Sequence, residues 1–353
     1  AIAGFTDEEI KRIEADGNLL GLQIEQARGT LRQLAQASGA ERGDGPAIDE
    51  CGPVDRTVVV SQTGDLWTMD LGGHRLLCGD ATDAGAVAEA MGGATARLLA
   101  TDPPYGVDHV ATKRGIPGFT FAAGKDLHDI QNDGLVGDKL RRFLAAMLAG
   151  CKPHCDRAAV YLWHAGLAAS VPVIQAAEDA DLVLHRQIVW AKPGIVLTRS
   201  GMYHWSHEPC FFCWWRGAQP KWFGTMDQRT VWSFGHDSER VGHPTQKPAA
   251  CFMIPLHNHT LPGEVLLDPF AGSGTALVAA ARAGRRCVAL EIDPAYVDVA
   301  VRRWQRFTGD HARLGDARGP TFDQVAAERI RRGRKARAAP RKGPQPAVKA
   351  PAG

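Results

Sequence analysis

The stretch Val265-Leu-Leu-Asp-Pro-Phe-Ala-Gly-Ser-Gly-Thr275 decides the fold. A short apolar run, typical of a buried strand, ends at Asp268 and is followed by a Gly-x-Gly turn at Gly272 and Gly274 and then by an Ala-rich helical segment. The next strand-like run, Val288-Ala-Leu-Glu291, also ends in an acid. This arrangement indicates a nucleoside pocket at the carboxyl ends of parallel strands, where Glu291 would accept hydrogen bonds from both ribose hydroxyls.

The same alternation of strand and helix continues toward the N-terminus. Apolar runs predict strands at 97–100, 158–163, 187–190, 264–268 and 286–291, and Ala-rich segments predict helices at 139–149, 167–180, 275–283 and 294–308. Strands that alternate with helices of this length indicate an α/β fold with a doubly wound, mainly parallel sheet and helices on both faces. No internal repeat is found.

A second motif, Thr101-Asp-Pro-Pro-Tyr-Gly106, follows the strand predicted at 97–100. Two prolines hold the backbone extended and supply no N–H, so the loop presents hydrogen-bond acceptors in fixed positions. An aromatic amino group is a poor nucleophile, because its lone pair is delocalised into the ring. If Asp102 and the Pro103 carbonyl each accept one N–H, the lone pair is directed outward, and Tyr105 offers a face on which an extruded base can stack.

With both motifs in this order, the chain resembles the permuted β group of amino-methylating DNA methyltransferases. The resemblance is reinforced by Leu77-Cys-Gly-Asp-Ala81, Val189-Trp-Ala-Lys192 and His243-Pro-Thr-Gln-Lys-Pro248, and it covers about residues 64–307. It implies a seven-stranded Rossmann-like sheet of the S-adenosylmethionine-dependent methyltransferase type. The implied reaction is direct methyl transfer from S-adenosyl-L-methionine to N6 of a flipped-out adenine in double-stranded DNA.

The resemblance also assigns roles to residues at the matching motifs. The catalytic loop would consist of Asp102, Pro103, Pro104 and Tyr105. The cofactor would be bound by Asp80 near its adenine, Glu291 at its ribose, Thr245 and Lys247 near its methionine carboxylate, and Asp268, Phe270, Gly272, Gly274 and Thr275 around its methionine and adenosine parts. No metal is expected, because Cys210 and Cys213 lie in a strand-like run without the glycine-rich knuckle of a zinc site.

Other functions for the two motifs stay open at this point. The glycine turn is not a P-loop, because no Gly-Lys-Ser/Thr follows, but it could serve a nicotinamide-dependent dehydrogenase, although Leu277 stands where a third glycine is expected. The glycine turn could also be a plain strand-to-helix turn, and the motif at 101–106 a rigid Pro-Pro turn, with no catalytic role for either. The chain as a whole could be an inactive DNA-binding module. N4-cytosine methylation is the nearest rival reaction, and methylation of RNA or of protein glutamine is more distant. Asp rather than Ser at position 102 favours adenine.

Contacts to DNA are expected from basic residues near the site and in the tail. The segment 201–234 is rich in aromatic residues, and we weight core packing over DNA contact for most of them. About residues 201–242 would include a short target-recognition region, so we expect a short recognition sequence or relaxed specificity. The candidate DNA-binding residues are Lys113, Arg114, Arg216, Lys221, Arg334 and Lys335.

Composition divides the chain into three parts: a helical appendage and linker at 1–60, a catalytic domain at 61–310 and a basic, disordered tail at 311–353. Nine Lys and Arg and no acid occur between Arg329 and Lys349. The rest of the chain has 32 Lys and Arg against 39 Asp and Glu, which gives it a net charge of −7. Eight scattered cysteines and the lack of a long apolar run predict a cytoplasmic, nucleoid-associated protein with reduced thiols and no membrane contact. A homodimer and a partner restriction endonuclease both remain open.

Overall fold

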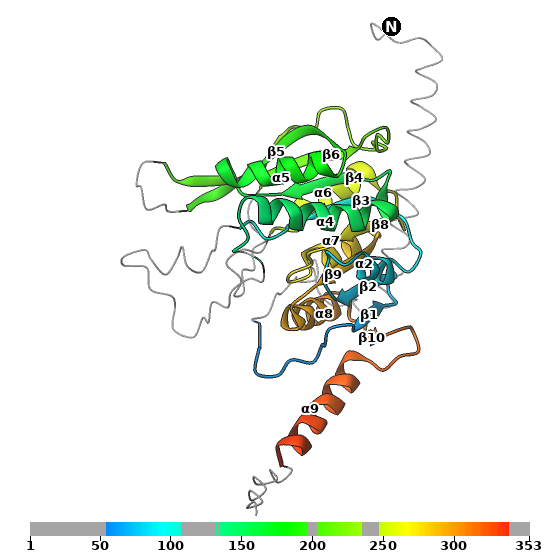
Figure 1. Ribbon diagram of the computed structural model, residues 1–353. Coiled ribbons are helices and arrows are strands. Elements are labelled where there is room, and N and C mark those ends of the chain that lie inside the picture. The colour runs from blue at the N-terminus through cyan, green and yellow to red at the C-terminus, as the bar shows by residue number, and fades with distance from the viewer. Residues whose placement is uncertain (1–53, 107–131, 133, 197–202, 235–246, 339–353) are drawn as a thin grey trace, which may run out of the picture.

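The computed structural model describes residues 54–106, 132, 134–196, 203–234 and 247–338. These residues form one ten-stranded sheet with the order β10-β1-β2-β9-β8-β3-β4-β6-β5-β7 (Figure 1). The strands are β1 (Leu66–Met69), β2 (His74–Cys78), β3 (Ala96–Thr101), β4 (Ala159–Trp163), β5 (Leu182–Val196), β6 (Trp205–Trp215), β7 (Val231–Ser233), β8 (Val265–Asp268), β9 (Arg286–Glu291) and β10 (Ala312–Leu314).

The centre of the sheet is parallel, as predicted, and the edges are mixed. Strands β2, β9, β8, β3 and β4 run parallel, whereas β1, β10 and β6 pair antiparallel with their neighbours. The fold class is confirmed, but the expected count of seven strands was wrong. The described part of the chain has ten, because the three- and four-residue strands β7, β10 and β1, at or next to the edges, are too short to show a recognisable alternation.

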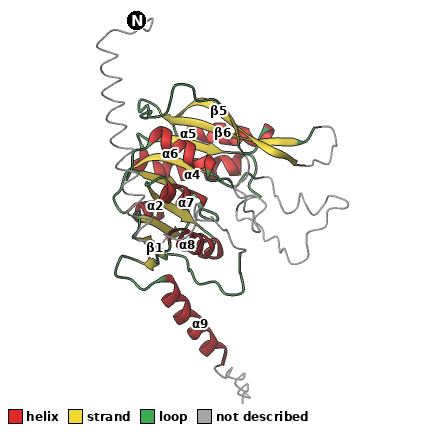
Figure 2. Cartoon of the chain, turned by 180° about the vertical axis from the view of Figure 1, so that it is seen from behind, coloured by secondary structure: helices red, strands yellow, loops and turns green. Residues whose placement is uncertain are grey.

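Helices cover both faces of the sheet (Figures 1 and 2). Residues of α2, α4 and α5 belong to the buried cluster on one face, and residues of α6, α7 and α8 belong to the cluster on the other. The helices are α2 (Ala84–Met91), α4 (Asp138–Cys155), the 3₁₀ turn η1 (Leu167–Ala169), α5 (Ser170–Asp179), α6 (Ala250–His259), α7 (Thr275–Arg282), α8 (Pro294–Thr308) and α9 (Phe322–Ala338).

The direction of the crossovers reverses between β3 and β8. From β3 the chain passes through α4 to β4 on one side, whereas from β8 it passes through α7 to β9 on the other. The two strands are hydrogen-bonded neighbours, with Leu99 opposite Leu267. The loops that leave their carboxyl ends therefore diverge at a topological switch point, where ligands bind in open α/β sheets.

The stretch after residue 311 is not simply a disordered tail. Strand β10 pairs with β1 at the edge of the sheet, and the buried ring of Phe322, at the start of α9, lies 5.0 Å from that of Trp67. Arg329, which the charge count assigned to the tail, forms an ion pair with Asp65 and donates to the Val60 carbonyl at 2.7 Å. The charge count did not take into account that Phe322, Val325 and Ala326 recur at helical spacing and form one buried apolar face.

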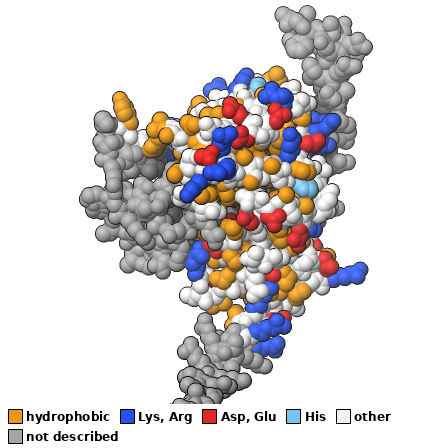
Figure 3. Space-filling model, in the orientation of Figure 1, with side chains coloured by type: hydrophobic (Ala, Val, Ile, Leu, Met, Phe, Trp, Pro, Cys, Tyr) orange, Lys and Arg blue, Asp and Glu red, His pale blue; other side chains and the backbone are white. Residues whose placement is uncertain are grey.

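The face covered by α4 and α5 carries acidic and basic side chains side by side (Figure 3). Arg141 of α4 and Asp179 of α5, for example, form an ion pair at 2.7 Å. Such mixed charge gives no extended positive surface for a polyanion on this face. Within the described residues, no helix combines the length and apolar character needed to cross a bilayer.

Candidate active site

The two motifs that the sequence singled out lie side by side at the switch point. Asp102 directly follows β3, and Asp268 ends the neighbouring strand β8. The hydroxyl of Thr101 donates to Asp268 Oδ1 at 2.7 Å, which ties the two strand ends together. Because each loop follows the carboxyl end of a parallel strand, the loops at 102–105 and 272–274 share one edge of the sheet.

The glycine turn is built by two residues in the left-handed region. Gly272 has φ of +50° and Gly274 has φ of +81°, and Gly274 is the residue that precedes α7. A Cβ on Gly274 would lie 2.8 Å from the Ala300 Cβ of α8, so only glycine allows this helix to pack so closely. A Cβ on Gly272 would meet nothing within 4 Å among the described residues. The outer side of this loop is therefore open to a ligand.

Two acids flank the glycine turn. Glu291, at the end of β9, accepts the Gly272 N–H at 2.8 Å and the Asp293 N–H at 2.9 Å, one on each carboxylate oxygen. Each oxygen keeps a second lone pair for another donor. Burial raises the pKa of Glu291 to about 7 and that of Asp268 to about 7. Donors from a ligand would favour the ionised forms of both acids.

Arg303 of α8 holds the other side of the glycine turn, a role that the sequence did not reveal. Its side chain is buried, and Nη1 donates to the Ser273 carbonyl at 3.1 Å and to the Thr275 hydroxyl at 2.9 Å. The predicted cofactor residue Thr275 is itself buried and serves this contact. In sequence, Arg303 is one of several basic residues of a helix, and no local pattern marks it as buried.

Asp102 is held by one carboxylate oxygen only. Its Oδ2 lies 2.9 Å from Lys247 Nζ, whereas its Oδ1 is shielded from solvent and has no hydrogen-bond partner among the described residues. A buried acceptor without a donor costs free energy, so this atom is suited to receive an N–H from a substrate. The position agrees with the role that the sequence predicts for Asp102.

Lys247 uses all three of its donors within this cluster. Besides Asp102, its ammonium group donates to the Tyr105 hydroxyl at 2.7 Å and contacts Glu208 Oε2 at 2.7 Å. Glu208, on β6, also forms an ion pair through its other oxygen with Lys192 of β5. Two lysines and two carboxylates thus alternate in one chain of ion pairs, with the buried Lys247 at its centre.

Charge and burial compete in this cluster. Burial raises the pKa of Asp102 even though Lys247 lowers it. Burial alone would raise the pKa of Glu208, but Lys247 and Lys192 bring it down to about 2. Burial alone would lower the pKa of Lys247, but the carboxylates of Asp102 and Glu208 raise it above the usual range. Lys247 and Glu208 are therefore charged at neutral pH.

Two aromatic rings enclose the ammonium group of Lys247. Its Nζ lies 4.9 Å from the ring centre of Trp163, at the end of β4, and 5.2 Å from that of Tyr105. Both rings stabilise the cation through their faces, which fixes the lysine in place. Tyr105 is partly exposed, as a ring that stacks on a base must be.

Other predicted cofactor residues lie along the same edge of the sheet. Asp80 is exposed just after β2, which pairs with β9 through Cys78 and Glu291. The carboxylate of Asp80 accepts the N–H and the hydroxyl of Thr82, both at 2.8 Å. Phe270 lies in the loop after β8 and packs against Phe143 of α4, with 5.7 Å between ring centres. Thr245 lies outside the described residues.

The predicted DNA contacts are not brought together at this site. Arg216 lies at the opposite edge of the sheet, where it pairs with Asp181 at 2.9 Å, and Lys221 is exposed in the connection between β6 and β7. Lys113 and Arg114 lie outside the described residues, and so do the side chains of Arg334 and Lys335 in α9. The DNA interface stays a prediction.

The aromatic segment divides between core and surface. Phe211, Trp215 and Trp232 are buried, whereas Trp222 is 41% exposed and Tyr203 is 91% exposed. Cys210 and Cys213, considered above as zinc ligands, belong to the core clusters on opposite faces of the sheet. No group of three metal-ligating side chains occurs in the described part of the chain.

Comparison with known proteins assigns this constellation to a family. The family model described as DNA methylase (N6_N4_Mtase) matches residues 96–302, which contain both loops and the Lys247 cluster. The chain belongs to the DNA methylase family. Its match to the family begins with β3 and ends within α8, so it spans the switch point and both helical layers.

Two curated relatives match part of the chain. The Type II methyltransferase M.XycI of Xanthomonas campestris pv. cyanopsidis is 29% identical over 153 residues, 40% of this chain and 51% of that protein. The Type II methyltransferase M.Cfr9I of Citrobacter freundii is 31% identical over 151 residues, 37% of this chain and 47% of that protein. The chain thus spans about half the length of the curated relatives it matches.

The solved structures that resemble this chain include the following two. PvuII DNA methyltransferase (cytosine-N4-specific) is 14% identical, with a TM-score of 0.49 and coverage of 77% of this chain and 97% of that one. The M1.HpyAVI–SAM complex is 19% identical, with a TM-score of 0.46 and coverage of 63% of this chain and 95% of that one.

Proposed function

We propose that this DNA methylase transfers a methyl group from S-adenosyl-L-methionine to an exocyclic amino group of DNA, namely N6 of adenine. The observation that carries the proposal is the state of Asp102. Lys247 holds one carboxylate oxygen, and the other is shielded from solvent and has no partner among the residues that the structure describes. A nucleotide base extruded from its duplex supplies an amino N–H suited to that atom.

The residues around the glycine turn fit the cofactor. Glu291 would hold the ribose, the open side of Gly272 would accept the nucleoside, and Asp268 would lie near the methionine part. When bound, S-adenosyl-L-methionine supplies an electrophilic methyl group. The assigned residues of the loop at 102–105 and of the cofactor pocket remain proposals that mutagenesis must test.

The chain's own groups prepare the nucleophile. Asp102 Oδ1 and the Pro103 carbonyl each accept an N–H of the amino group, and Tyr105 stacks on the base. This geometry directs the nitrogen lone pair away from the two acceptors. As the nitrogen is methylated it loses a proton, and the carboxylate of Asp102, whose pKa burial raises, is the nearest acceptor for it.

Glu208 and Lys192 act through Lys247 rather than on the substrate. The ion pair with Glu208 fixes the orientation of the Lys247 ammonium group, and Lys247 in turn fixes Asp102. We regard Glu208 as a positioning residue. Since all three donors of Lys247 are used within the cluster, its expected contact with the methionine carboxylate would require one of these bonds to break.

N4-cytosine methylation remains the second candidate, because its amino group presents the same chemistry. Asp at position 102 favours adenine. Incubation of plasmid DNA with labelled cofactor, followed by nucleoside mass spectrometry, tests the proposal. Labelled N6-methyladenine would support it, and labelled N4-methylcytosine would show that cytosine is the target base. If no nucleoside is labelled, DNA is not the substrate. Base flipping, the division at residue 60 and the recognition region at 201–242 stay proposals. Nucleoid association, a homodimer and an endonuclease partner stay proposals as well.

A further inference from the structure

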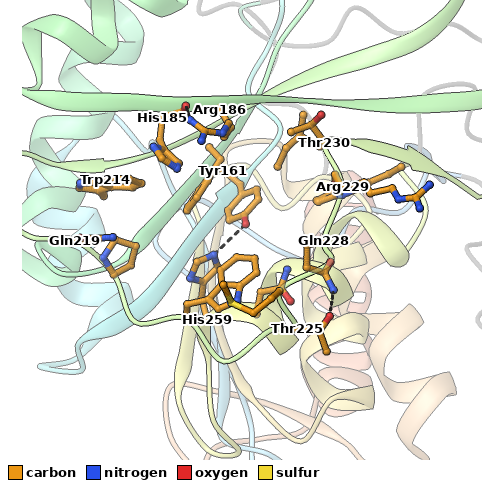
Figure 4. Close-up of a pocket in the computed structure, with 17 residues that line it drawn as sticks. Tyr161, His185, Arg186, Trp214, Gln219, Thr225, Gln228, Arg229, Thr230 and His259 are labelled. Atoms are coloured by element: carbon orange, nitrogen blue, oxygen red, sulfur yellow. Dashed lines mark hydrogen bonds between the residues drawn. The ribbon is translucent and has the colours of Figure 1, made fainter. Parts of the chain in front are cut away.

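A second pocket lies on the α6 side of the sheet, beneath the connection from β6 to β7. Its volume is about 600 Å³. Tyr161 and His259 lie near its centre, with Trp214 and Gln219 on one side and Gln228 on the other (Figure 4). None of the residues assigned above to catalysis or to the cofactor lines this pocket, so it is a separate site.

The pocket offers aromatic faces at its floor and rim. Tyr161 of β4 and Phe212 of β6 are stacked with 5.0 Å between ring centres, and Phe212 is only partly buried. Trp222 at the rim is 41% exposed. An exposed ring beside an aromatic floor is suited to a flat ligand, because stacking needs a face rather than a particular hydrogen-bond pattern.

The lining is also cationic and carries no carboxylate. Its charged or titratable members are Arg186, Arg229, His185 and His259. Arg186 donates to the His185 carbonyl at 2.8 Å, and neither Arg186 nor Arg229 forms an ion pair with another described residue. The nearby carboxylate of Asp227 does not line the pocket, and it accepts the Thr225 hydroxyl at 2.5 Å. The charge of Arg229 acts on Asp227 without a direct ion pair, and Arg186 and Arg229 together make the lining suited to an anionic ligand.

Hydrogen bonds within the protein hold the wall of the pocket in place. His259 bonds through Nε2 to the Tyr161 hydroxyl at 3.0 Å and through Nδ1 to the Lys221 carbonyl at 2.8 Å. The Phe223 N–H donates to the Asn258 carbonyl at 2.7 Å, which attaches the connection to α6. Because these contacts fix the wall in advance, binding would not have to order it.

The pocket is connected to the candidate active site through aromatic rings. Trp232 lines the pocket and contacts Trp163 edge-on, with 6.2 Å between ring centres. The same Trp163 lies 4.9 Å from Lys247 Nζ. Two rings thus separate the pocket from the lysine that holds Asp102, and an occupant would lie next to the catalytic region.

We propose that this pocket binds one nucleotide of the DNA substrate other than the reacting one. Its base would stack on Trp222 and Phe212, its phosphate would lie near Arg186 or Arg229, and side-chain amides such as Gln228 would contact the base edge. An apolar protein segment would offer neither guanidinium group an anionic partner. The proposal rests on the proposed function, because it takes DNA as the substrate.

Photo-crosslinking of the full chain to DNA tests this proposal. The probe is a duplex of about 20 base pairs that carries 5-iodouracil in place of thymine, used with S-adenosyl-L-methionine present. We expect cross-linked peptides that contain Trp222 or Trp214. Trp222→Ala should weaken DNA affinity by about tenfold and raise KM for DNA more than it lowers kcat, whereas Trp222→Phe should restore both.

Matched controls separate this site from the general DNA interface. Val171→Ala removes an exposed apolar side chain of α5 that does not line the pocket, and Arg142→Ala is the counterpart of Arg186→Ala on α4. Neither control should change DNA affinity. If DNA affinity and KM are unchanged in both Trp222→Ala and Arg186→Ala, the proposal is wrong. It is also wrong if these variants lose self-association and still bind DNA normally. If the unaltered protein methylates DNA in the same experiment, such a result rejects the pocket's role and leaves the proposed function standing.

Discussion

Lys247 Nζ lies 2.9 Å from Asp102 Oδ2, whereas Asp102 Oδ1 has no hydrogen-bond partner in the part of the chain that the structure describes. One half of the carboxylate is thus fixed by the protein, and the other half is available to a substrate. Under the proposed function, this division would let Asp102 stay rigid and still accept an amino N–H. It also makes the substitution of Asp102 informative.

Asp102→Asn should reduce methyl transfer by at least about a thousandfold, because the amide presents a weaker acceptor and cannot take the proton. Cofactor affinity should stay within about threefold of that of the unaltered protein, since Asp102 lies outside the glycine turn. Calorimetric titration with S-adenosyl-L-methionine and a labelled-methyl assay measure the two quantities. Equal loss of both would show that the substitution disturbs the fold rather than the chemistry.

Glu208→Gln tests the positioning role of the second carboxylate. Glu208 raises the pKa of Asp102, so its neutralisation should shift the acid limb of the kcat profile to lower pH as well as lower kcat by roughly tenfold. Glu89→Gln, on the exposed side of α2, is the control and should leave the profile unchanged. A reduced rate without any shift of the acid limb would assign Glu208 a merely structural role.

Cofactor binding should depend on pH through Glu291. Burial raises its pKa to about 7 in the free protein, and the ionised form accepts the ribose hydroxyls. Affinity for S-adenosyl-L-methionine should therefore increase as pH rises from about 6 to about 8, and Glu291→Gln should weaken binding and flatten this dependence. Asp268, whose pKa is also about 7, would leave a residual slope. Affinity that is constant over this range would contradict the assignment.

The raised pKa of Glu291 also makes the free energy of unfolding depend on pH. Glu291 binds a proton more tightly in the folded protein than in the unfolded one, so its contribution to the unfolding free energy falls as pH rises from about 4.5 to about 7. Without cofactor, Glu291→Gln should reduce this decline. Urea unfolding at several pH values measures the slope, and an identical slope in the variant would count against the raised pKa.

Gly274→Ala should destabilise the fold by about 2–4 kcal/mol, since it combines backbone strain with a clash against Ala300. Gly217→Ala separates the two effects, because Gly217 has φ of +77° but open space around its Cβ position. That control should cost only about 1 kcal/mol. Denaturant unfolding of both variants gives the difference, and equal losses would show that contact with α8 is unimportant.

Sequence patterns predicted the central architecture because its signals are local. The helix at 294–308 begins after Asp293, which accepts the Ala295 N–H, and the strand at 286–291 contains a continuous apolar run at 287–290 that is followed by Glu291. Strand-end acids and the two loops could be placed at one edge of the sheet, because parallel strands bring their carboxyl ends together. The adjacency of Asp102 and Asp268 followed from this rule.

The Lys247 cluster could not be predicted in the same way. Glu208 lies on an antiparallel strand among aromatic residues, and neither its spacing from Lys247 nor its type marks the two as partners. Only the pairing of β6 with both β4 and β5 brings Glu208, Lys192 and the end of β4 together. Strand β10 and helix α9 were missed for a different reason, since basic residues dominate their surroundings and obscure a short apolar face.

The most direct measurement is mass spectrometry of nucleosides from DNA incubated with the purified chain and labelled S-adenosyl-L-methionine. The account predicts labelled N6-methyladenine with the unaltered protein and none with Asp102→Asn. Labelled N4-methylcytosine would contradict the choice of adenine. Transfer by Asp102→Asn at the rate of the unaltered protein would contradict the claim that the free oxygen of Asp102 orients the amino group.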